Sequence, residues 1–438
     1  MKEQIRIPTG KVERASRFIG AGARIGRNYV RHYTQKLIDR DMGKDELHQQ
    51  NAEVIYESLS QLKGSALKVA QMMSMDRNML PQAYQEKFAL AQYSAPPLSF
   101  PLVAKTFRQA FGKNPHELFD TFTTSAVNAA SIGQVHRAEL NGRGLAVKVQ
   151  YPGVAESINS DLNMVKPVAR RLFNISEADI DYYMGEVQSK LLEETNYSLE
   201  LEQAVSIAGA CAHLKSLVFP KYYPELSTPR ILTMDWLEGL TLDQFLRSDP
   251  DQETRDLLGQ ILWDFYSYQI HVLKMVHADP HPGNFLFMQE RRIGVLDFGC
   301  VKVIPEDFYH AYFRVYDPSL VDDPSRFEHW LRELGFLSQS DSESEKRLFT
   351  GIFREMVKLL GRPFFEPEFD FSDTGFFRSI YELGERIAGM KEVRSSRSAR
   401  GPQHGLYINR TYFGLYHLLH SLKSRVSTRL SDVALRSA

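Results

Sequence analysis

Residues 277–284 read HADPHPGN, and residues 296–299 read LDFG. The first stretch fits the pattern H-x-D-x-x-x-x-N, whose aspartate orients or deprotonates a phosphate acceptor and whose asparagine holds a metal ion. In the second, a short apolar strand leads into an Asp-Phe-Gly turn, where the aspartate ligates Mg²⁺ and the glycine lets the backbone turn sharply. These patterns make Asp279 a candidate catalytic residue and Asn284 and Asp297 candidate metal ligands.

A third element lies upstream, at Ala146-Val147-Lys148. Residues 135–140 alternate, Asn141-Gly142 is a strong hairpin turn, and residues 145–150 are β-rich, so the lysine lies on a strand. A lysine there reaches the α- and β-phosphates of a nucleotide. Each element alone is weak, because an ordinary strand lysine, a helix-capping aspartate and a chance DFG turn explain them equally well. Their order and contexts together favour an ATP and Mg²⁺ site of the protein-kinase type.

The remaining pattern predicts an α+β, bilobal protein-kinase-like fold with a small β-rich N-lobe and a helical C-lobe. We place the lobes at residues 119–236 and 237–438, behind a helical N-terminal extension at 1–118. Further elements are expected as helices at 51–75, 155–173 and 181–214 and as strands at 230–236, 285–288 and 293–296.

The loop before the lysine strand departs from the usual kinase pattern. Where G-x-G-x-x-G is expected over the phosphates, residues 125–134 read SAVNAASIGQ, with one glycine. Alanine resists the positive φ values that glycine accepts, so the loop should be stiffer and differently shaped. Ala129, Ala130 and Ser131 are candidates for contact with the nucleotide, and the loop argues against an ordinary protein kinase.

Charge is unevenly distributed along the 438 residues, although the formal net charge is only −1. That balance gives no argument for nucleic acid, but residues 1–40 hold ten Lys or Arg against three Asp or Glu. Residues 11–40 also show a helical period of apolar positions. Two interpretations stay open: a basic helix that makes peripheral contact with an anionic membrane, and a helix packed on its own protein with a solvated basic face.

Cysteine content and hydropathy bear on the compartment. Two cysteines in a chain of this length do not form a disulfide framework, which favours a reducing environment. No apolar run approaches the roughly 20 residues that span a bilayer. We expect an intracellular, cytoplasmic protein, peripheral on the inner membrane, or a mitochondrial one if the source is eukaryotic.

Together these motifs resemble the UbiB family of atypical kinase-like proteins, which includes AarF-type bacterial proteins and ADCK-type proteins of coenzyme Q biosynthesis. The resemblance is carried by residues 129–136 (AASIGQVH), 146–154 (AVKVQYPGV), 277–284 and 296–299, and it runs from roughly residue 50 to 310. It implies that an alanine-rich loop replaces the glycine-rich one.

The resemblance adds two further motifs. A K-x-G-Q helix of the family folds over the site and blocks the space for a protein substrate; Lys68 to Gln71 match it, with Ala70 in place of glycine. The family's E-x-D motif, which pairs with the strand lysine, matches residues 194–196, with asparagine in place of aspartate. It nominates Glu194 as the partner of Lys148, whereas spacing alone leaves open Glu186, Glu193, Glu194, Glu200 and Glu202.

For function, the resemblance implies ATPase activity, support of isoprenoid-quinone biosynthesis, and contact with a membrane or with a small-molecule, lipid or quinone-precursor ligand. We therefore expect a UbiB-type, Mg-ATP-dependent atypical kinase or ATPase. Two alternatives are a nucleotide-binding pseudokinase switch, which Ala70 and Asn196 favour, and a trans-acting protein kinase, which the alanine-rich loop disfavours. The oligomeric state stays open.

Overall fold

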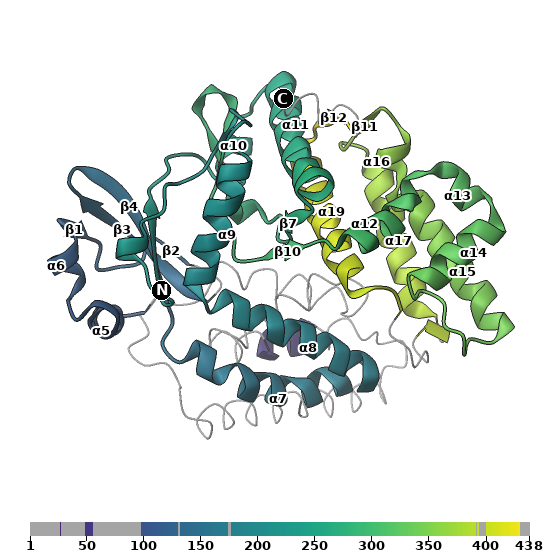
Figure 1. Ribbon diagram of the computed structural model, residues 1–438, viewed down its shortest axis with the longest axis horizontal. Coiled ribbons are helices and arrows are strands. Elements are labelled where there is room, and N and C mark those ends of the chain that lie inside the picture. The colour runs from purple at the N-terminus through teal and green to yellow at the C-terminus, as the bar shows by residue number, and fades with distance from the viewer. Residues whose placement is uncertain are drawn as a thin grey trace. The chain divides into compact units, whose positions relative to one another are not determined.

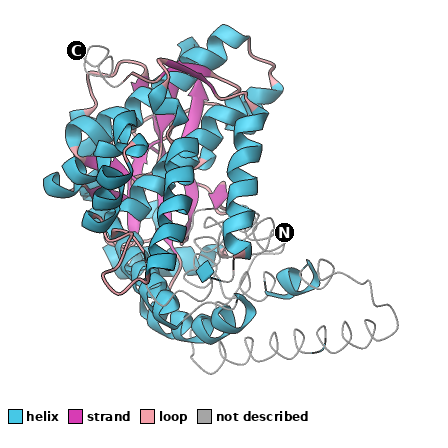
Figure 2. Ribbon diagram, turned by 90° about the vertical axis from the view of Figure 1, so that its right-hand side faces the viewer, coloured by secondary structure: helices cyan, strands magenta, loops and turns pink. Residues whose placement is uncertain are grey.

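The structure is a computed structural model, and it describes residues 98–129, 132–173, 177–390 and 400–429, with Arg27 and the short pieces 49–55 and 392–393. The chain divides into two compact units: unit 1 comprises residues 1–201 and 222–236, and unit 2 comprises residues 202–221 and 237–438. Helices make up most of the described chain (Figure 2). The architecture is the predicted kinase-like α+β fold, whereas the predicted three-part division of the chain stays a prediction.

Most of the predicted N-terminal features lie outside the described residues. Of the helix expected at 51–75, residues 51–55 are described and are helical. The basic stretch within residues 1–40 is not described apart from Arg27. Its expected contact with a membrane therefore stays a prediction.

Unit 1 is built on a five-stranded antiparallel sheet in the order β1-β3-β4-β6, with β2 also paired to β3 (Figure 1). The strands are β1 (Thr121–Phe122), β2 (Asn128–Ala129), β3 (Gly133–Leu140), β4 (Arg143–Gln150) and β6 (Ile231–Asp235). Asn141 and Gly142 connect β3 to β4 with φ values of 52° and 73°, the left-handed geometry of a tight hairpin turn. The predicted hairpin and the predicted strand at 230–236 are confirmed.

The helices of unit 1 include α5 (Phe100–Phe111), α6 (Pro115–Leu118), α7 (Val154–Phe173), α8 (Glu177–Glu194) and the first turn of α9 (Tyr197–Ala210). The prediction of a single helix at 181–214 is wrong, because the helix is interrupted at residues 195–196, between α8 and α9. Oδ1 of Asn196 accepts from the backbone N–H groups of Ser198 and Leu199, at 3.2 and 3.4 Å. Asparagine is favoured as such a cap, so it begins a new helix here.

A buried polar chain fastens β3 to the segment before α5. The Gln134 side chain accepts from the N–H of Leu98 at 2.6 Å, and its Nε2 lies 2.9 Å from Nε2 of His136. Nδ1 of His136 lies 2.7 Å from the carbonyl of Thr123. Because the Gln134 nitrogen can only donate and the Thr123 carbonyl can only accept, His136 must be the neutral Nδ1–H tautomer. Burial lowers the pKa of His136 from 6.5 to about 4, against a smaller opposing effect of the Thr123 carbonyl.

Unit 2 combines short sheets with a helical body. Strand β9 (Arg292–Val295) lies between β5 (Leu217–Val218) and β8 (Phe285–Met288), and β7 (Met275–His277) pairs with β10 (Val301–Val303). Strands β8 and β9 confirm the predicted strands at 285–288 and 293–296. A third pair joins β11 (Glu368–Asp370) to β12 (Arg425–Ser427).

In unit 2, α11 (Gln252–Tyr268) lies beside α19 (Gln403–Leu422) (Figure 1). Trp263 and Phe265 of α11 and Leu415 and Leu419 of α19 are fully buried and form the centre of this body. The other helices are α10 (Leu242–Arg247), α12 (Glu306–Tyr312), α13 (Pro318–Asp322), α14 (Pro324–Glu333), α15 (Glu343–Leu360), α16 (Arg362–Phe365) and α17 (Thr374–Gly389).

The buried His136 predicts a specific loss of stability in acid. Because its pKa is lower folded than unfolded, the unfolded chain binds more protons between about pH 6.5 and 4, and stability falls as the pH falls through that window. From pH 6.5 to about pH 4.5 the loss from this group is about 2 kcal/mol. Urea unfolding at both pH values should show a weaker pH dependence for His136→Gln than for wild type. The exposed His329→Gln is the control, and equal pH dependence in all three proteins would contradict the assignment.

Candidate active site

In unit 1, the candidate phosphate-binding lysine is buried and paired. Lys148 lies on β4 between Val135 of β3 and Leu232 of β6, and it is 5% exposed. Its Nζ lies 2.7 and 2.9 Å from the two carboxylate oxygens of Glu200. The flanking strands fix the backbone of Lys148, and the bidentate contact fixes its charged end.

The structure corrects the predicted partner of this lysine. Glu194 was expected to pair with Lys148, but the described contact is made by Glu200. Glu194 is the last residue of α8, whereas Glu200 lies in the first turn of α9. The beginning of α9 is held against the sheet, because Nε2 of Gln150 donates to the Thr195 carbonyl at 2.8 Å. With this hydrogen bond in place, the carboxylate of Glu200, in the first turn of α9, reaches the Lys148 ammonium.

Two further contacts shape this part of unit 1. The Lys148 ammonium lies 4.9 Å from the ring centroid of Tyr197, and the N–H of Tyr197 donates to the Pro229 carbonyl at 3.1 Å. A Cβ at Gly133 would stand 2.5 Å from the Val149 carbonyl oxygen and 2.7 Å from the Tyr197 hydroxyl. The one glycine of the alanine-rich loop is therefore required by close packing.

The structure describes only some of the other residues predicted to contact the nucleotide. Ala129 lies on β2 opposite Gln134 of β3, and its side chain is not described. Ala130, Ser131, Lys68 and Gln71 lie outside the described residues. Their predicted roles over the phosphates and the cleft stay predictions.

In unit 2, the predicted metal ligands lie at the same end of one hairpin. Asn284 immediately precedes β8, and Leu296 and Asp297 follow β9, its antiparallel partner. The N–H of Leu296 donates to the Asn284 carbonyl at 2.9 Å, which continues the ladder to the ligand positions. Antiparallel pairing thus brings Asn284 and Asp297 together.

The side chains of these two residues fit a hard cation. Nδ2 of Asn284 donates to the Asp279 carbonyl at 2.8 Å, which leaves the amide oxygen as the atom that can meet a cation. Oδ1 of Asp297 accepts from the N–H of Gly299 at 2.7 Å, which orients the carboxylate. Among the described residues no three His, Cys, Asp or Glu side chains gather around one point. A carboxylate and an amide suit Mg²⁺, which takes its other ligands from phosphate and water.

The loop that carries Asp279 is fastened to the DFG segment. The N–H of Ala278 donates to the Cys300 carbonyl at 2.7 Å, which extends the pairing of β7 with β10. Phe298 is fully buried, and its ring centroid lies 5.6 Å from that of His277 and 6.0 Å from that of Phe219. The apolar Phe298 therefore anchors the segment, while the neighbouring Asp297 is left partly exposed.

Sequence reasoning missed one residue of this site, Arg410 on α19. Its Nη2 donates to Oδ1 of Asp279 at 3.0 Å, and the two side chains are only 18% and 16% exposed. One turn later, a Cβ at Gly414 would collide with Pro280. Arg410 lies 131 residues from Asp279 in sequence and in no recognisable motif, so no spacing rule could have found it.

The contact between Arg410 and Asp279 has a chemical consequence. The guanidinium offsets part of the negative charge of the carboxylate and holds one of its oxygens in place. The carboxylate predicted to orient a water molecule or an acceptor hydroxyl is thereby fixed at one of its oxygens. Arg410 is therefore a positioning residue for Asp279.

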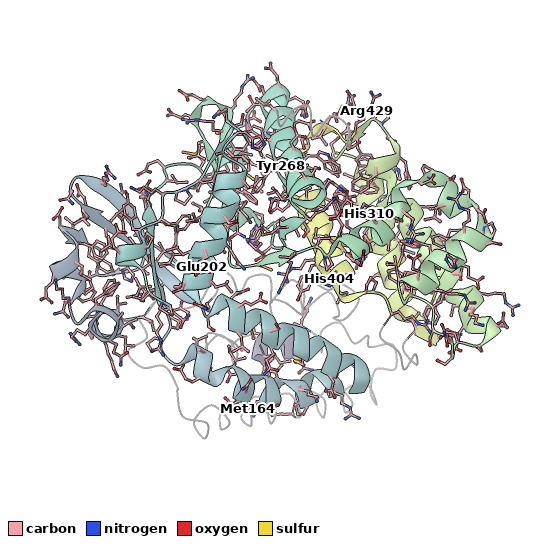
Figure 3. All side chains as sticks on the ribbon, viewed as in Figure 1. Met164, Glu202, Tyr268, His310, His404 and Arg429 are labelled. Carbon is pink, nitrogen blue, oxygen red and sulfur yellow. The ribbon has the colours of Figure 1, made fainter. Side chains whose placement is uncertain are left out.

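The importance of the Lys148–Glu200 pair can be measured by stability. Glu200→Gln leaves a buried ammonium without its carboxylate, so the free energy of unfolding should fall by about 3 kcal/mol in urea titrations. Glu202→Gln is the control, since Glu202 lies on the same helix (labelled in Figure 3) and is exposed; its effect should stay within about 0.5 kcal/mol. The double change Lys148→Met/Glu200→Leu should recover most of the loss. Equal effects of the two single variants would refute the buried pair.

Comparison with known proteins identifies related chains. The family model of the ABC1 atypical kinase-like domain matches residues 90–326. The probable serine/threonine-protein kinase abkA of Dictyostelium discoideum is 26% identical over 97% of this chain and 79% of its own length. The mitochondrial atypical kinase COQ8 of Saccharomyces cerevisiae is 26% identical over 94% of this chain and 82% of its own length.

A solved structure is similar as well. The structure of Rv3197 from Mycobacterium tuberculosis in complex with erythromycin is 25% identical in sequence, with a TM-score of 0.60. It covers 88% of this chain, and the match spans 96% of that protein. In the described part of the chain, no helix is both long and apolar enough to cross a membrane.

Proposed function

This chain belongs to the UbiB family of atypical kinase-like proteins, the proteins of the ABC1 domain, and from that premise we propose that it is an Mg-ATP-dependent ATPase or atypical kinase. We further propose that it supports isoprenoid-quinone or lipid metabolism at a membrane surface. Two observations support the first part, each within its own unit: the buried Lys148–Glu200 pair of unit 1 and the hairpin end of unit 2 that carries Asn284 and Asp297. Phosphoryl transfer depends mostly on placing such charges.

Each residue has a distinct part in this proposal. Lys148 binds nucleotide phosphates, and Glu200 keeps its ammonium oriented. Asn284 and Asp297 would hold Mg²⁺, which when bound neutralises charge on the phosphates. Asp279, oriented by Arg410, positions a water molecule or an acceptor hydroxyl.

The setting at a membrane rests on sequence and family resemblance. Residues 1–40 carry the excess of positive charge that attracts anionic lipid. Lys68 and Gln71, in the motif that resembles the family's occluding helix, would exclude protein substrates and leave water, a lipid or a quinone precursor as acceptor. These residues lie outside the described ones, so the proposal draws on their sequence alone.

One observation favours the second candidate, a nucleotide-binding pseudokinase. Asp279 is already engaged by Arg410, and an aspartate held in this way is a poorer base for an acceptor hydroxyl. A pseudokinase would bind nucleotide tightly without turning it over. Turnover therefore separates the two candidates.

The proposal is tested by ATP hydrolysis with purified protein, with and without anionic liposomes and a phenolic quinone precursor. We expect turnover that requires Mg²⁺, is lost in EDTA, and falls at least about 100-fold in Asp297→Asn, the loss typical for one charge-stabilising group. Asp307→Asn, an exposed change on α12, should have no effect. No turnover in any condition, with nucleotide binding unchanged in Asp297→Asn, would refute the enzyme and leave the pseudokinase.

The role of Arg410 gives a separate prediction. Arg410→Gln removes a charge-assisted hydrogen bond to Asp279, so kcat should fall about tenfold, equivalent to about 1.4 kcal/mol, while KM for ATP stays nearly constant. Arg410→Lys keeps the charge and should retain more of the activity. The two parameters are measured by steady-state kinetics. A rise of kcat in Arg410→Gln would show instead that the arginine restrains Asp279.

A further inference from the structure

Unit 2 contains a cavity of about 120 Å³ that is separate from the residues discussed so far. Residues of α12, α14, α15, α16 and α19 line it. Eight of its fourteen lining residues are aromatic and none is charged. Except for Tyr312 and Val315, the lining residues lie beyond residue 326, where the match to the family domain ends.

Two helices present matched apolar stripes to the cavity. Phe353, Met356, Val357 and Leu360 of α15 follow one another at helical spacing, and residues 409, 412, 413 and 416 of α19 repeat that spacing. Positions with this spacing lie on one face of a helix. Such stripes normally pack against each other. Here the α15 stripe stays half-exposed, so apolar surface remains that a ligand could cover.

The cavity persists because α19 is held from its other side. Arg410 is paired with Asp279, and Gly414 is in close contact with Pro280. The Tyr412 hydroxyl lies 3.0 Å from Nε2 of His271. These contacts fasten α19 to the loop of Asp279 and to the segment that follows α11, so α19 is held away from α15.

At its beginning, α19 is also held against α12. The rings of Phe308 and His404 lie 5.3 Å apart, and Figure 3 labels His404 on α19 and His310 on α12. The Tyr312 hydroxyl donates to Oδ1 of Asn409 at 2.5 Å. The α12 side of the cavity is therefore fixed as well.

The polar groups around the cavity define what it can bind. The Tyr416 hydroxyl donates to the Leu360 carbonyl at 3.0 Å, and the hydroxyls of Tyr312 and Tyr412 are engaged as described above. The three tyrosines therefore offer ring faces rather than hydroxyl groups. Asn409 is exposed, and its Nδ2 makes no hydrogen bond to any of the described residues, so the rim of the cavity supplies one amide donor.

Size and charge then narrow the ligand. An apolar cavity of about 150 Å³ holds benzene, so about 120 Å³ suits one six-membered ring or slightly less. A charged group would lose its hydration without gaining a partner, which is costly in an apolar site. Aromatic walls favour a flat ring in offset or edge-to-face contact.

We propose that this cavity binds an uncharged, single-ring aromatic ligand that presents one hydrogen-bond acceptor to Asn409. The site is independent of the nucleotide residues, and the proposal does not require that the protein hydrolyse ATP.

A binding experiment with the full chain tests it, with 3-fluoropyridine, an uncharged single ring with one hydrogen-bond acceptor, as the probe and ¹⁹F NMR as the readout. We expect saturable binding of one probe per chain with a Kd of about 0.1 to 1 mM, the affinity usual for a ligand of this size. The charged 4-fluorobenzoate should not bind. Asn409→Ala should weaken binding about threefold to tenfold, through the loss of one hydrogen bond.

Variants then locate the site. Val357→Phe fills the cavity and should weaken binding at least about tenfold, and Met356→Phe gives a second filling variant if the first does not fold. Leu406→Phe is the matched control, since Leu406 is exposed on α19 and does not line the cavity; it should bind within about twofold of wild type. Equal binding by wild type and a folded filling variant, equal binding of the benzoate, or no saturable binding by wild type would each overturn the proposal.

Discussion

A buried charge must be paired, and the core of unit 1 is arranged around this requirement. Lys148 is almost fully enclosed on the central strand β4, where an unpaired ammonium would cost several kcal/mol. The carboxylate of Glu200 removes most of that cost, but only if α9 begins at the right place against the sheet. Asn196 caps that helix, and Gln150 and Pro229 hold its first residues. The Asn196 cap, the start of α9 and its attachment to the sheet thus all serve to place a carboxylate against the Lys148 ammonium.

In unit 2, strand pairing and one distant helix place the polar side chains of the candidate site. The pairing of β8 with β9 brings Asn284 and Asp297 together. The buried Phe298 anchors the segment that connects Asp297 to β10. Asp279 receives its positive partner from α19, far along the chain. The same helix, fastened on that side, leaves an aromatic cavity on its other side. The position of α19 therefore determines both the contact of Arg410 with Asp279 and the presence of the cavity.

Local patterns predicted much of this arrangement. The β3–β4 hairpin followed from alternation and an Asn-Gly turn, and strands β8 and β9 followed from short apolar runs between polar residues. The resemblance to the UbiB family was correct. The resemblance gave the wrong partner for Lys148, because it assigned the carboxylate by motif position. Asn196 begins a new helix, α9, and the carboxylate that faces β4 is Glu200 in its first turn, six residues after Glu194.

The sequence by itself determined the order of the motifs, the residue types that suit phosphate and Mg²⁺, and the strands that present them, because these depend on neighbours a few residues apart. Only the tertiary structure decided which glutamate meets Lys148, that Arg410 meets Asp279, and that the apolar stripes of α15 and α19 leave a cavity between them. Contacts of this kind join positions separated by 52 and 131 residues. No local propensity encodes them, since they arise when whole helices are placed by packing.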